Sequence, residues 1–242
     1  MKRILFTTVS LSVLGLMSPA LGADLSPYIK APGGVAPAYD WSGFYVGVFG
    51  GGGFGNHNIN NGTPTGFATF LNTYDSTGAV AGGEIGYNFQ SGHYLVGVEA
   101  TGFWSSIKGS DASQQLGLID ADNLREATTV VARGGITVDR LLLFFTGGWA
   151  YGDILHTNTN PGFTPAVDQF ALTRSGLTAG GGIGYALTDN LIGKFEYRYF
   201  DFGTYSRANP LNGQLPYTVS TTYSVLTVGL DYKFGGPVVA KY

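Results

Sequence analysis

The chain has 242 residues, of which 39 are glycine, 34 are aromatic (16 Phe, 15 Tyr and 3 Trp) and none is cysteine. Charged residues make up 12%, about half the share that is usual in a soluble domain. The lack of cysteine excludes disulfides, cysteine-ligated metal sites and thiol catalysis. The formal charge of −3 provides no basic surface for binding nucleic acid.

The first 22 residues have the organisation of a secretory signal peptide. Lys2 and Arg3 precede an apolar stretch at 4–17, and small residues precede a cleavage site at Ala23. This stretch is shorter than the roughly 20 residues that a membrane-spanning helix needs. We therefore expect residues 1–22 to be removed on export. Residues 23–40 contain three prolines, which favour an extended chain, and are predicted to form a periplasmic tail.

From Trp41 onward, apolar residues recur at every second position, which is the period of a β-strand. In residues 93–104, one face is uncharged and has Tyr94 and Trp104 at its ends, whereas the other face carries Glu99. The same division predicts eight strands, at 41–54, 77–89, 93–104, 126–138, 141–151, 177–187, 193–199 and 224–234. On the first of these, Phe44, Val46 and Val48 are predicted to share the apolar face.

The connections between these strands alternate in length. Short turns are predicted near 90–93, 139–140 and 188–190, and long polar loops near 55–75, 107–124, 153–170 and 206–218. Short turns at one end and long loops at the other indicate an up-and-down meander. Residues 78–87 and 176–185 match at seven of ten positions, so strand pairs two–three and six–seven resemble copies of one hairpin.

The alternation fits a soluble barrel and a membrane barrel, which differ in whether the outer surface contacts water or lipid. A soluble barrel would need a charged exterior, but the polar faces carry little charge beyond four acids and four bases. These eight are Glu84, Glu99, Arg133, Lys194, Glu196, Arg198, Asp231 and Lys233. Their balance favours a packed interior network, with an ion-selective lining as the alternative. Aromatic residues at strand ends on the apolar face resemble the girdles of a membrane barrel; they are Tyr87, Phe89, Tyr94, Trp104, Trp149, Tyr151, Tyr197 and Tyr199.

The predicted fold is all-β: an eight-stranded antiparallel up-and-down transmembrane β-barrel at 41–234, followed by a C-terminal extension at 235–242. Strands of about ten residues suffice to cross an apolar band of about 25 Å at this tilt. Eight strands leave an interior just wide enough for side chains to fill. We therefore expect the interior charges to be packed together and not to line a wide channel.

Several motifs in the predicted strands identify a resemblance to a known family. They are WSGFYVG at 41–47, GEIGY at 83–87, VGVE at 96–99, TGGWAYG at 146–152, KFEYRY at 194–199 and VGLDYKF at 228–234. In this order the chain resembles the small alphaproteobacterial outer-membrane immunogenic or porin-like proteins, within the OmpA-like barrel group. The resemblance implies that the barrel-assembly machinery reads Val228, Leu230, Tyr232 and Phe234 as a signal. The chain departs from the family pattern by continuing for eight residues beyond Phe234.

Other motifs are better explained without chemistry. Residues 50–55 fit the G-x-G-x-x-G spacing, but a polar loop is expected after them where a dinucleotide site needs a helix. His57 and His156 are predicted to lie on long loops at one end, which raises the alternative of a surface hydrolase. No serine has a nucleophile-elbow context. Three loop acids, Asp120, Asp122 and Glu126, fit a cation site less well than a solvated loop.

The sequence thus predicts an outer-membrane protein with a structural or surface-exposed role, and no enzyme. A narrow pore for small solutes is the first alternative, and a hydrolase that uses the loop histidines is the second. The expected partners are outer-membrane lipid and the assembly machinery, with neither cofactor nor metal. Nothing in the sequence identifies a surface ligand or a host contact.

Overall fold

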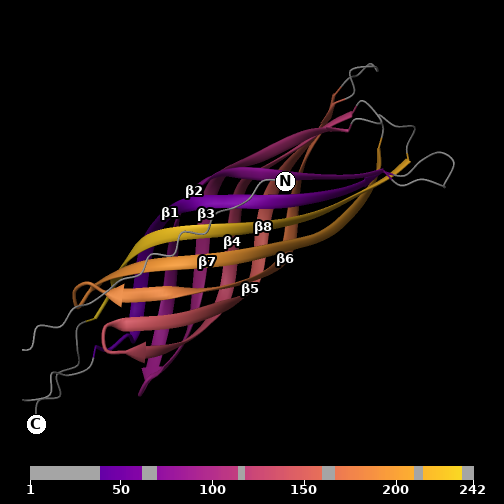
Figure 1. The fold of residues 1–242 in the computed structure, drawn as a ribbon. Helices are drawn as coiled ribbons and strands as arrows, with labels where there is room; N and C mark the ends of the chain where they lie inside the picture. Colours follow the sequence, from indigo (N-terminus) through magenta and orange to yellow (C-terminus); the bar gives the residue numbers. More distant parts are fainter. Residues whose placement is uncertain (1–38, 62–69, 114–117, 160–166, 210–214, 236–242) are drawn as a thin grey trace, which may run out of the picture. The chain divides into compact units, whose positions relative to one another are not determined.

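The computed structural model describes residues 39–61, 70–113, 118–159, 167–209 and 215–235. They form eight antiparallel strands that pair in chain order, and the last pairs with the first to close a barrel (Figure 1). The strands are β1 (Gly43–Asn61), β2 (Phe70–Ser91), β3 (Tyr94–Ser113), β4 (Leu118–Val138), β5 (Leu141–Thr159), β6 (Val167–Ala186), β7 (Leu191–Asn209) and β8 (Leu215–Lys233). The predicted fold, strand count and strand order are confirmed.

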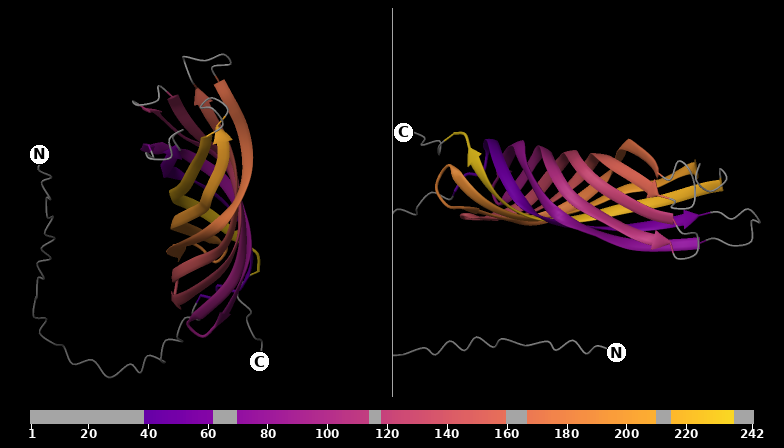
Figure 2. Two further views of the ribbon diagram at one scale, coloured as in Figure 1. Left: turned by 90° about the vertical axis from the view of Figure 1, so that its right-hand side faces the viewer. Right: turned by 90° about the horizontal axis from the view of Figure 1, so that it is seen from above.

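Three short connections lie at one end of the barrel, which we call the turn end. Gly92 and Asp139, in the β2–β3 and β4–β5 turns, have φ of 61° and 48°. Tight hairpin turns require this left-handed backbone, which glycine and aspartate tolerate better than most residues. We call the opposite end the loop end. The strands run steeply around the barrel between the two ends (Figure 2).

The strands extend much further toward the loop end than predicted. Residues 55–61, 70–75 and 153–159, for example, were predicted to be loops and instead continue β1, β2 and β5. The prediction was wrong here because polar residues stand on both faces of these stretches, as at Asn56, His57 and Asn58, which hides the period of two. Each strand has 19 to 22 residues, about twice the number that a bilayer requires. The loop end therefore projects beyond the apolar surface.

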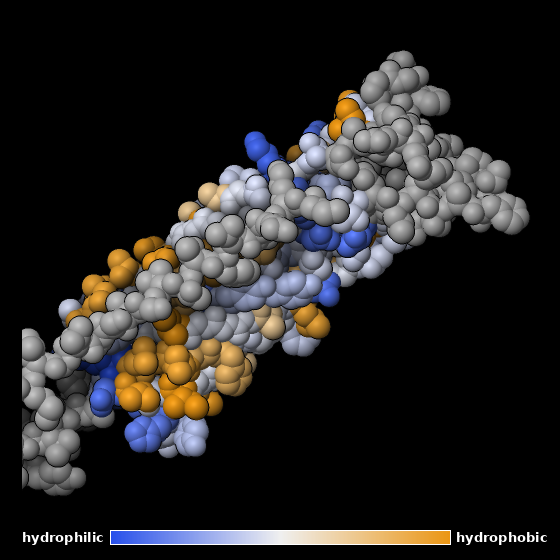
Figure 3. All heavy atoms as spheres, in the orientation of Figure 1, coloured by the Kyte–Doolittle hydropathy of each residue, from blue (hydrophilic) through white to orange (hydrophobic). Residues whose placement is uncertain are grey.

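The outer surface is apolar toward the turn end. Phe44, Val48, Val98 and Phe145 are more than half exposed there, so the predicted apolar face points outward. On the face drawn in Figure 3, hydrophobic side chains gather over the part of the barrel nearer the turn end.

Toward the loop end, this apolar surface ends at acidic residues. Asp153 and Asp201 follow Tyr151 and Tyr199 by two residues on the same outward face. Charges are costly on a lipid-facing surface, and aromatic residues favour its boundary. The apolar surface therefore ends at the outward aromatic residues.

Side chains fill the inside of the barrel, where two large apolar clusters lie in addition to the smaller pair of Tyr74 and Val219. The turn-end cluster contains Trp41, Leu95, Leu142, Phe144, Ala186 and Ile192. The larger cluster, toward the loop end, contains Val80, Phe103, Ile107, Leu124, Ala127, Ala150, Ile154, Phe200, Phe202, Tyr223 and Val225. Trp41 precedes β1, although it was predicted to begin the first strand. Its indole Nε1 donates to the carbonyl of Asp139 at 3.2 Å, which holds the ring in the turn end.

Some predicted segments lie outside the described residues. These are the signal peptide at 1–22, the tail at 23–40 apart from Tyr39 and Asp40, and the extension at 235–242 apart from Gly235. Among the residues that are described, no helix has the length and apolarity needed to cross a bilayer.

Replacing Val98 by arginine places a charge on the outward apolar surface of β3, where Val98 is 60% exposed. Folded into lipid vesicles, V98R is expected to lose about 2–4 kcal/mol of unfolding free energy, because a charge near the bilayer centre is poorly solvated. Urea titration followed by the shift in gel mobility on heating measures this loss. Thr173→Arg, outward on the loop-end part of β6, is the matched control and should cost little. Equal stability of V98R and the parent would contradict the face assignment.

Candidate functional site

Seven charged side chains meet inside the barrel between the two apolar clusters, and we call them the charge layer. They are Glu84, Glu99, Arg133, Lys194, Glu196, Arg198 and Asp231, from β2, β3, β4, β7 and β8, and each is at most 7% exposed. Alternation along each strand points them inward. Gly47 leaves room for them, since a Cβ there would overlap the carboxylate of Asp231.

Glu99 is the most heavily paired acid of the charge layer. Its Oε1 accepts from Arg198 Nη2 at 2.7 Å, and its Oε2 accepts from Tyr45 Oη at 2.8 Å and Arg133 Nη1 at 3.3 Å. Arg198 Nε also donates to Glu196 Oε1 at 2.9 Å. A buried carboxylate that is satisfied on both oxygens avoids the large cost of desolvation. These contacts therefore tie β1, β3, β4 and β7 together across the interior.

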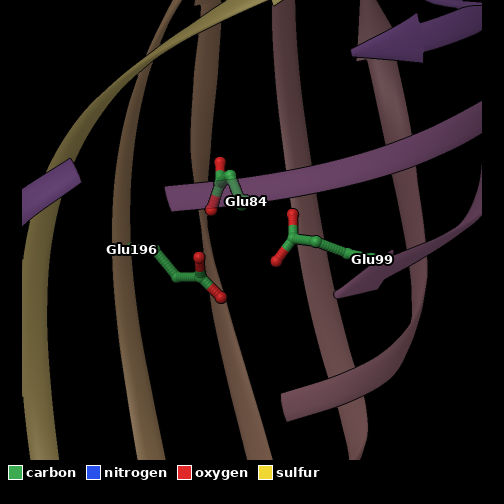
Figure 4. A group of neighbouring side chains, drawn as sticks. All are labelled: Glu84, Glu99 and Glu196. Atoms are coloured by element: carbon green, nitrogen blue, oxygen red, sulfur yellow. The ribbon is translucent and has the colours of Figure 1, made fainter. Parts of the chain in front are cut away.

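The ammonium of Lys194 lies among three carboxylates. It pairs with Glu84, is 3.3 Å from Glu196 Oε2 and is 3.5 Å from Glu99 Oε2. The three carboxyl groups point toward one another from β2, β3 and β7 (Figure 4), with ligand atoms within 4.8 Å of one another. Such a group could hold a hard divalent cation. Lys194 and Arg198 already supply positive charge to these oxygens, so the arrangement fits an internal ion-pair network better than a metal site.

The charge layer contains four acids and three bases. The fourth acid, Asp231, is 2% exposed and lies with Glu84 beside Gly47. Its Oδ1 is buried and has no hydrogen-bond partner among the described residues.

The structure does not bring Lys233, the eighth charge of the expected network, to the other seven. Its ammonium donates to the carbonyl of Asp40 at the turn end and lies 4.3 Å from the ring centroid of Tyr39. Through these contacts, Lys233 connects the segment before β1 to the end of β8.

A second buried polar cluster, the histidine cluster, lies nearer the loop end. Asp122, which is 2% exposed, accepts from Tyr74 Oη at 2.8 Å and lies 2.9 Å from His57 Nδ1. Its other oxygen contacts His156 Nδ1. The prediction that both histidines lie on long loops was wrong: His57 is in β1, His156 is in β5, and both are buried. A register shift between Leu124 and Glu126 reverses which β4 residues face inward. The alternation in the sequence therefore did not indicate that Asp122 faces inward.

The histidine cluster also includes a serine, and its order of contacts resembles a catalytic triad. Ser76 Oγ is 3.0 Å from His57 Nε2, and His57 Nδ1 faces Asp122. Ser76 is 1% exposed, and a Cβ at either Gly55 or Gly109 would overlap it. The barrel wall encloses the hydroxyl, so a substrate carbonyl cannot approach. The geometry supports a buried hydrogen-bond network and not an accessible nucleophile.

The residues predicted to form the aromatic girdles and the assembly signal lie on the outer surface. The eight aromatic residues of the expected girdles, Tyr87, Phe89, Tyr94, Trp104, Trp149, Tyr151, Tyr197 and Tyr199, are 39% to 72% exposed. Val228, Leu230, Tyr232 and Phe234 face the same way along β8 and just beyond it. Phe234 continues the pairing with β1, since its N–H donates to the carbonyl of Phe44 at 2.8 Å.

Comparisons with known proteins match most of the chain to outer-membrane proteins. A family model described as an outer membrane protein beta-barrel domain matches residues 8–234. The 25 kDa outer-membrane immunogenic protein of Brucella ovis is 30% identical over 229 residues, which cover 93% of this chain and 96% of that protein. The 31 kDa outer-membrane immunogenic protein of Brucella melitensis biotype 1 is 30% identical over 250 residues, which cover 97% and 100%. The crystal structure of the outer membrane protein OprG from Pseudomonas aeruginosa aligns with a TM-score of 0.48 at 15% identity, over 81% of this chain and 97% of that one.

Replacing Arg198 by leucine removes one of the two cations that Glu99 and Glu196 share, the other being Lys194. Both carboxylates stay buried, so we expect the free energy of unfolding to fall by about 3–5 kcal/mol. The matched control is Arg125→Leu, which breaks the pair that Arg125 forms with Asp153 at 2.9 Å. The Arg125 side chain is 51% exposed, so its pair should contribute less than about 1 kcal/mol. Urea unfolding of the two variants measures both losses, and equal losses would contradict the buried-network account.

Proposed function

The chain belongs to the outer membrane protein beta-barrel family and lies in the bacterial outer membrane, and from this premise we propose that it is a closed, non-conducting barrel. Its role is structural and surface-exposed: it shapes the envelope and presents its loop end to the outside. This role requires neither catalysis nor a cofactor. In this orientation the turn end of the barrel, with Tyr39 and Gly235, faces the periplasm.

The observation that carries the proposal is the continuous filling of the interior. From the turn end upward, the barrel contains the apolar cluster around Trp41, the charge layer, the larger apolar cluster around Phe200 and the histidine cluster. Arg133 links the first two layers, because its guanidinium lies 3.8 Å from the ring centroid of Phe144. A solute would have to displace each layer in turn.

Two internal cavities lined by described residues lie beside these layers, and both are small. One, lined in part by Glu84, Arg198 and Phe200, has a volume of about 20 Å³, and another, beside Asp122 and His156, is of the same size. A volume of roughly 10–15 Å³ holds a single water molecule. Each cavity therefore has room for about one water, whereas a pore needs a continuous water-filled path. This favours the closed barrel over the narrow pore.

The outer surface supports the two proposed partners. The apolar outer surface, with outward aromatic residues such as Trp104 and Tyr199, fits contact with outer-membrane lipid. Val228, Leu230, Tyr232 and Phe234 present one apolar face along β8, which fits a signal read by the assembly machinery during insertion. The relatives from Brucella are named immunogenic, which agrees with loops exposed at the cell surface.

Purified protein refolded into planar bilayers is expected to show no stable conductance, because the interior offers no continuous path for ions. Closure of the barrel is checked on the same sample by its altered gel mobility before and after heating. A general porin added afterwards to the same bilayer confirms that insertion is detectable. Large, steady current steps from heat-modifiable protein would overturn the proposal in favour of a pore.

The proposed orientation makes a separate prediction about intact cells. A peptide epitope inserted between residues 65 and 66, in the β1–β2 connection, should bind antibody on intact cells, since that connection lies at the loop end. The same epitope appended after Tyr242 is the matched control and should be detected only after the outer membrane is permeabilised. The reverse pattern would show that the orientation is inverted.

A further inference from the structure

The barrel wall is divided at its loop end. The ladder between β2 and β3 ends at the pair Thr77 and Lys108, and the ladder between β6 and β7 ends at Leu177 and Asp201. Beyond these points, and within the part of the chain that the structure describes, each of the four strands pairs with one neighbour only. β2 pairs with β1 as far as Phe70, β3 with β4 to Ser113, β6 with β5 to Val167, and β7 with β8 to Asn209.

The two divisions have the same local cause, and it coincides with the internal repeat of the sequence. Gly78 and Gly176 occupy the same position in the two matching segments. A Cβ at Gly78 would overlap the backbone of Ser106, and one at Gly176 would overlap the backbone of Asp201 and Phe202. Register shifts lie at these contacts, between Trp104 and Ile107 in β3 and between Asp201 and Thr204 in β7. Such bulges bend a strand and interrupt its pairing.

The divisions separate the loop end into two half-sheets, which we call the jaws. The first jaw is β7-β8-β1-β2 and the second is β3-β4-β5-β6, because β8–β1 and β4–β5 pair through to their last loop-end residues. Below the divisions, continuous ladders hold all eight strands together. Above them, no ladder joins the jaws among the described residues, although Gly109 lies against the backbone of Asp75 and Ser76 beside the first division.

Asp122 provides a buried polar contact between the jaws. It lies on β4 in the second jaw, and it accepts a hydrogen bond from Tyr74 on β2 and faces His57 on β1, both in the first jaw. His156, on β5 beside it, contacts the other oxygen and so orients the carboxylate. At the opposite division, the guanidinium of Arg174 on β6 lies 5.6 Å from the ring centroid of Tyr205 on β7. A cation over a ring is the weaker contact when part-exposed.

We propose that Asp122 is a latch that holds the jaws closed, and that their separation opens the external half of the barrel while the membrane-spanning half stays intact. The small cavity at this level is lined by residues of both jaws, among them His156 and Arg174 from the second and Tyr205 and Thr221 from the first. Opening would enlarge this cavity into a cleft that faces the outside. The charge layer, below the divisions, would keep the barrel closed to solutes.

The test uses pairs of spin labels on introduced cysteines, since the chain has no cysteine of its own. Labels at Asn58 on β1 and Thr157 on β5 report the distance between the jaws. Labels at Asn58 and Thr204 on β7 report a distance within the first jaw. In lipid, Asp122→Ala should shift the distance between the jaws to longer and broader values and leave the distance within the jaw unchanged. Tyr74→Phe, which removes one hydrogen bond and keeps the ring, should give a smaller shift.

Asp153→Ala is the matched control, because Asp153 is an acid of the same loop end that pairs outward with Arg125. It should alter neither distance. Retained heat-modifiable gel mobility of every variant shows that the membrane half is folded; should Asp122→Ala fail this check, Tyr74→Phe carries the test. An unchanged distance between the jaws in the folded variants would overturn the latch. An equal change in both distances would also overturn it, since that result indicates general loosening of the barrel.

Discussion

Closure of the sheet is the constraint on which the rest of the structure depends. Lipid offers no partners to backbone N–H and C=O groups, so a chain that crosses it as strands must pair every edge. Here β8 pairs with β1 and leaves no free edge below the two divisions. With only eight strands the interior is narrow. Large inward side chains therefore meet one another, and inward glycines such as Gly47 become necessary to make room for them.

The narrow interior explains why charge occurs inside this barrel in paired form. Seven charged groups on five strands lie within one layer, and most make several contacts with opposite charges. Buried pairs of this kind contribute little net stability compared with apolar packing, but breaking one is expensive. The layer therefore acts mainly on the arrangement of the strands, since a change of register would leave charges such as Glu99 or Arg198 without partners.

Much of this architecture could be predicted from residue patterns, and the failures have identifiable causes. Alternation correctly predicted eight strands, their order and the outward face that includes Val48 and Val98, because one side of each strand is uniformly apolar there. Alternation failed to predict how far the strands extend toward the loop end, because polar residues stand on both faces there and the period of two is lost. The shift at Leu124 concealed Asp122, and contacts such as those of Lys233 with Asp40 and Tyr39 depend on the path of the chain before β1.

The central claim is that the interior is filled at the level of the charge layer, and the accessibility of one side chain tests it most directly. Thr101 faces inward beside Arg198 and is 6% exposed, and a cysteine in its place would be the only thiol in the chain. The account predicts that a water-soluble, membrane-impermeant thiol reagent does not modify Thr101→Cys from either side of a lipid vesicle, while Asn58→Cys is modified from one side. Modification of Thr101→Cys as rapidly as Asn58→Cys would contradict it, because the interior would then be open to water.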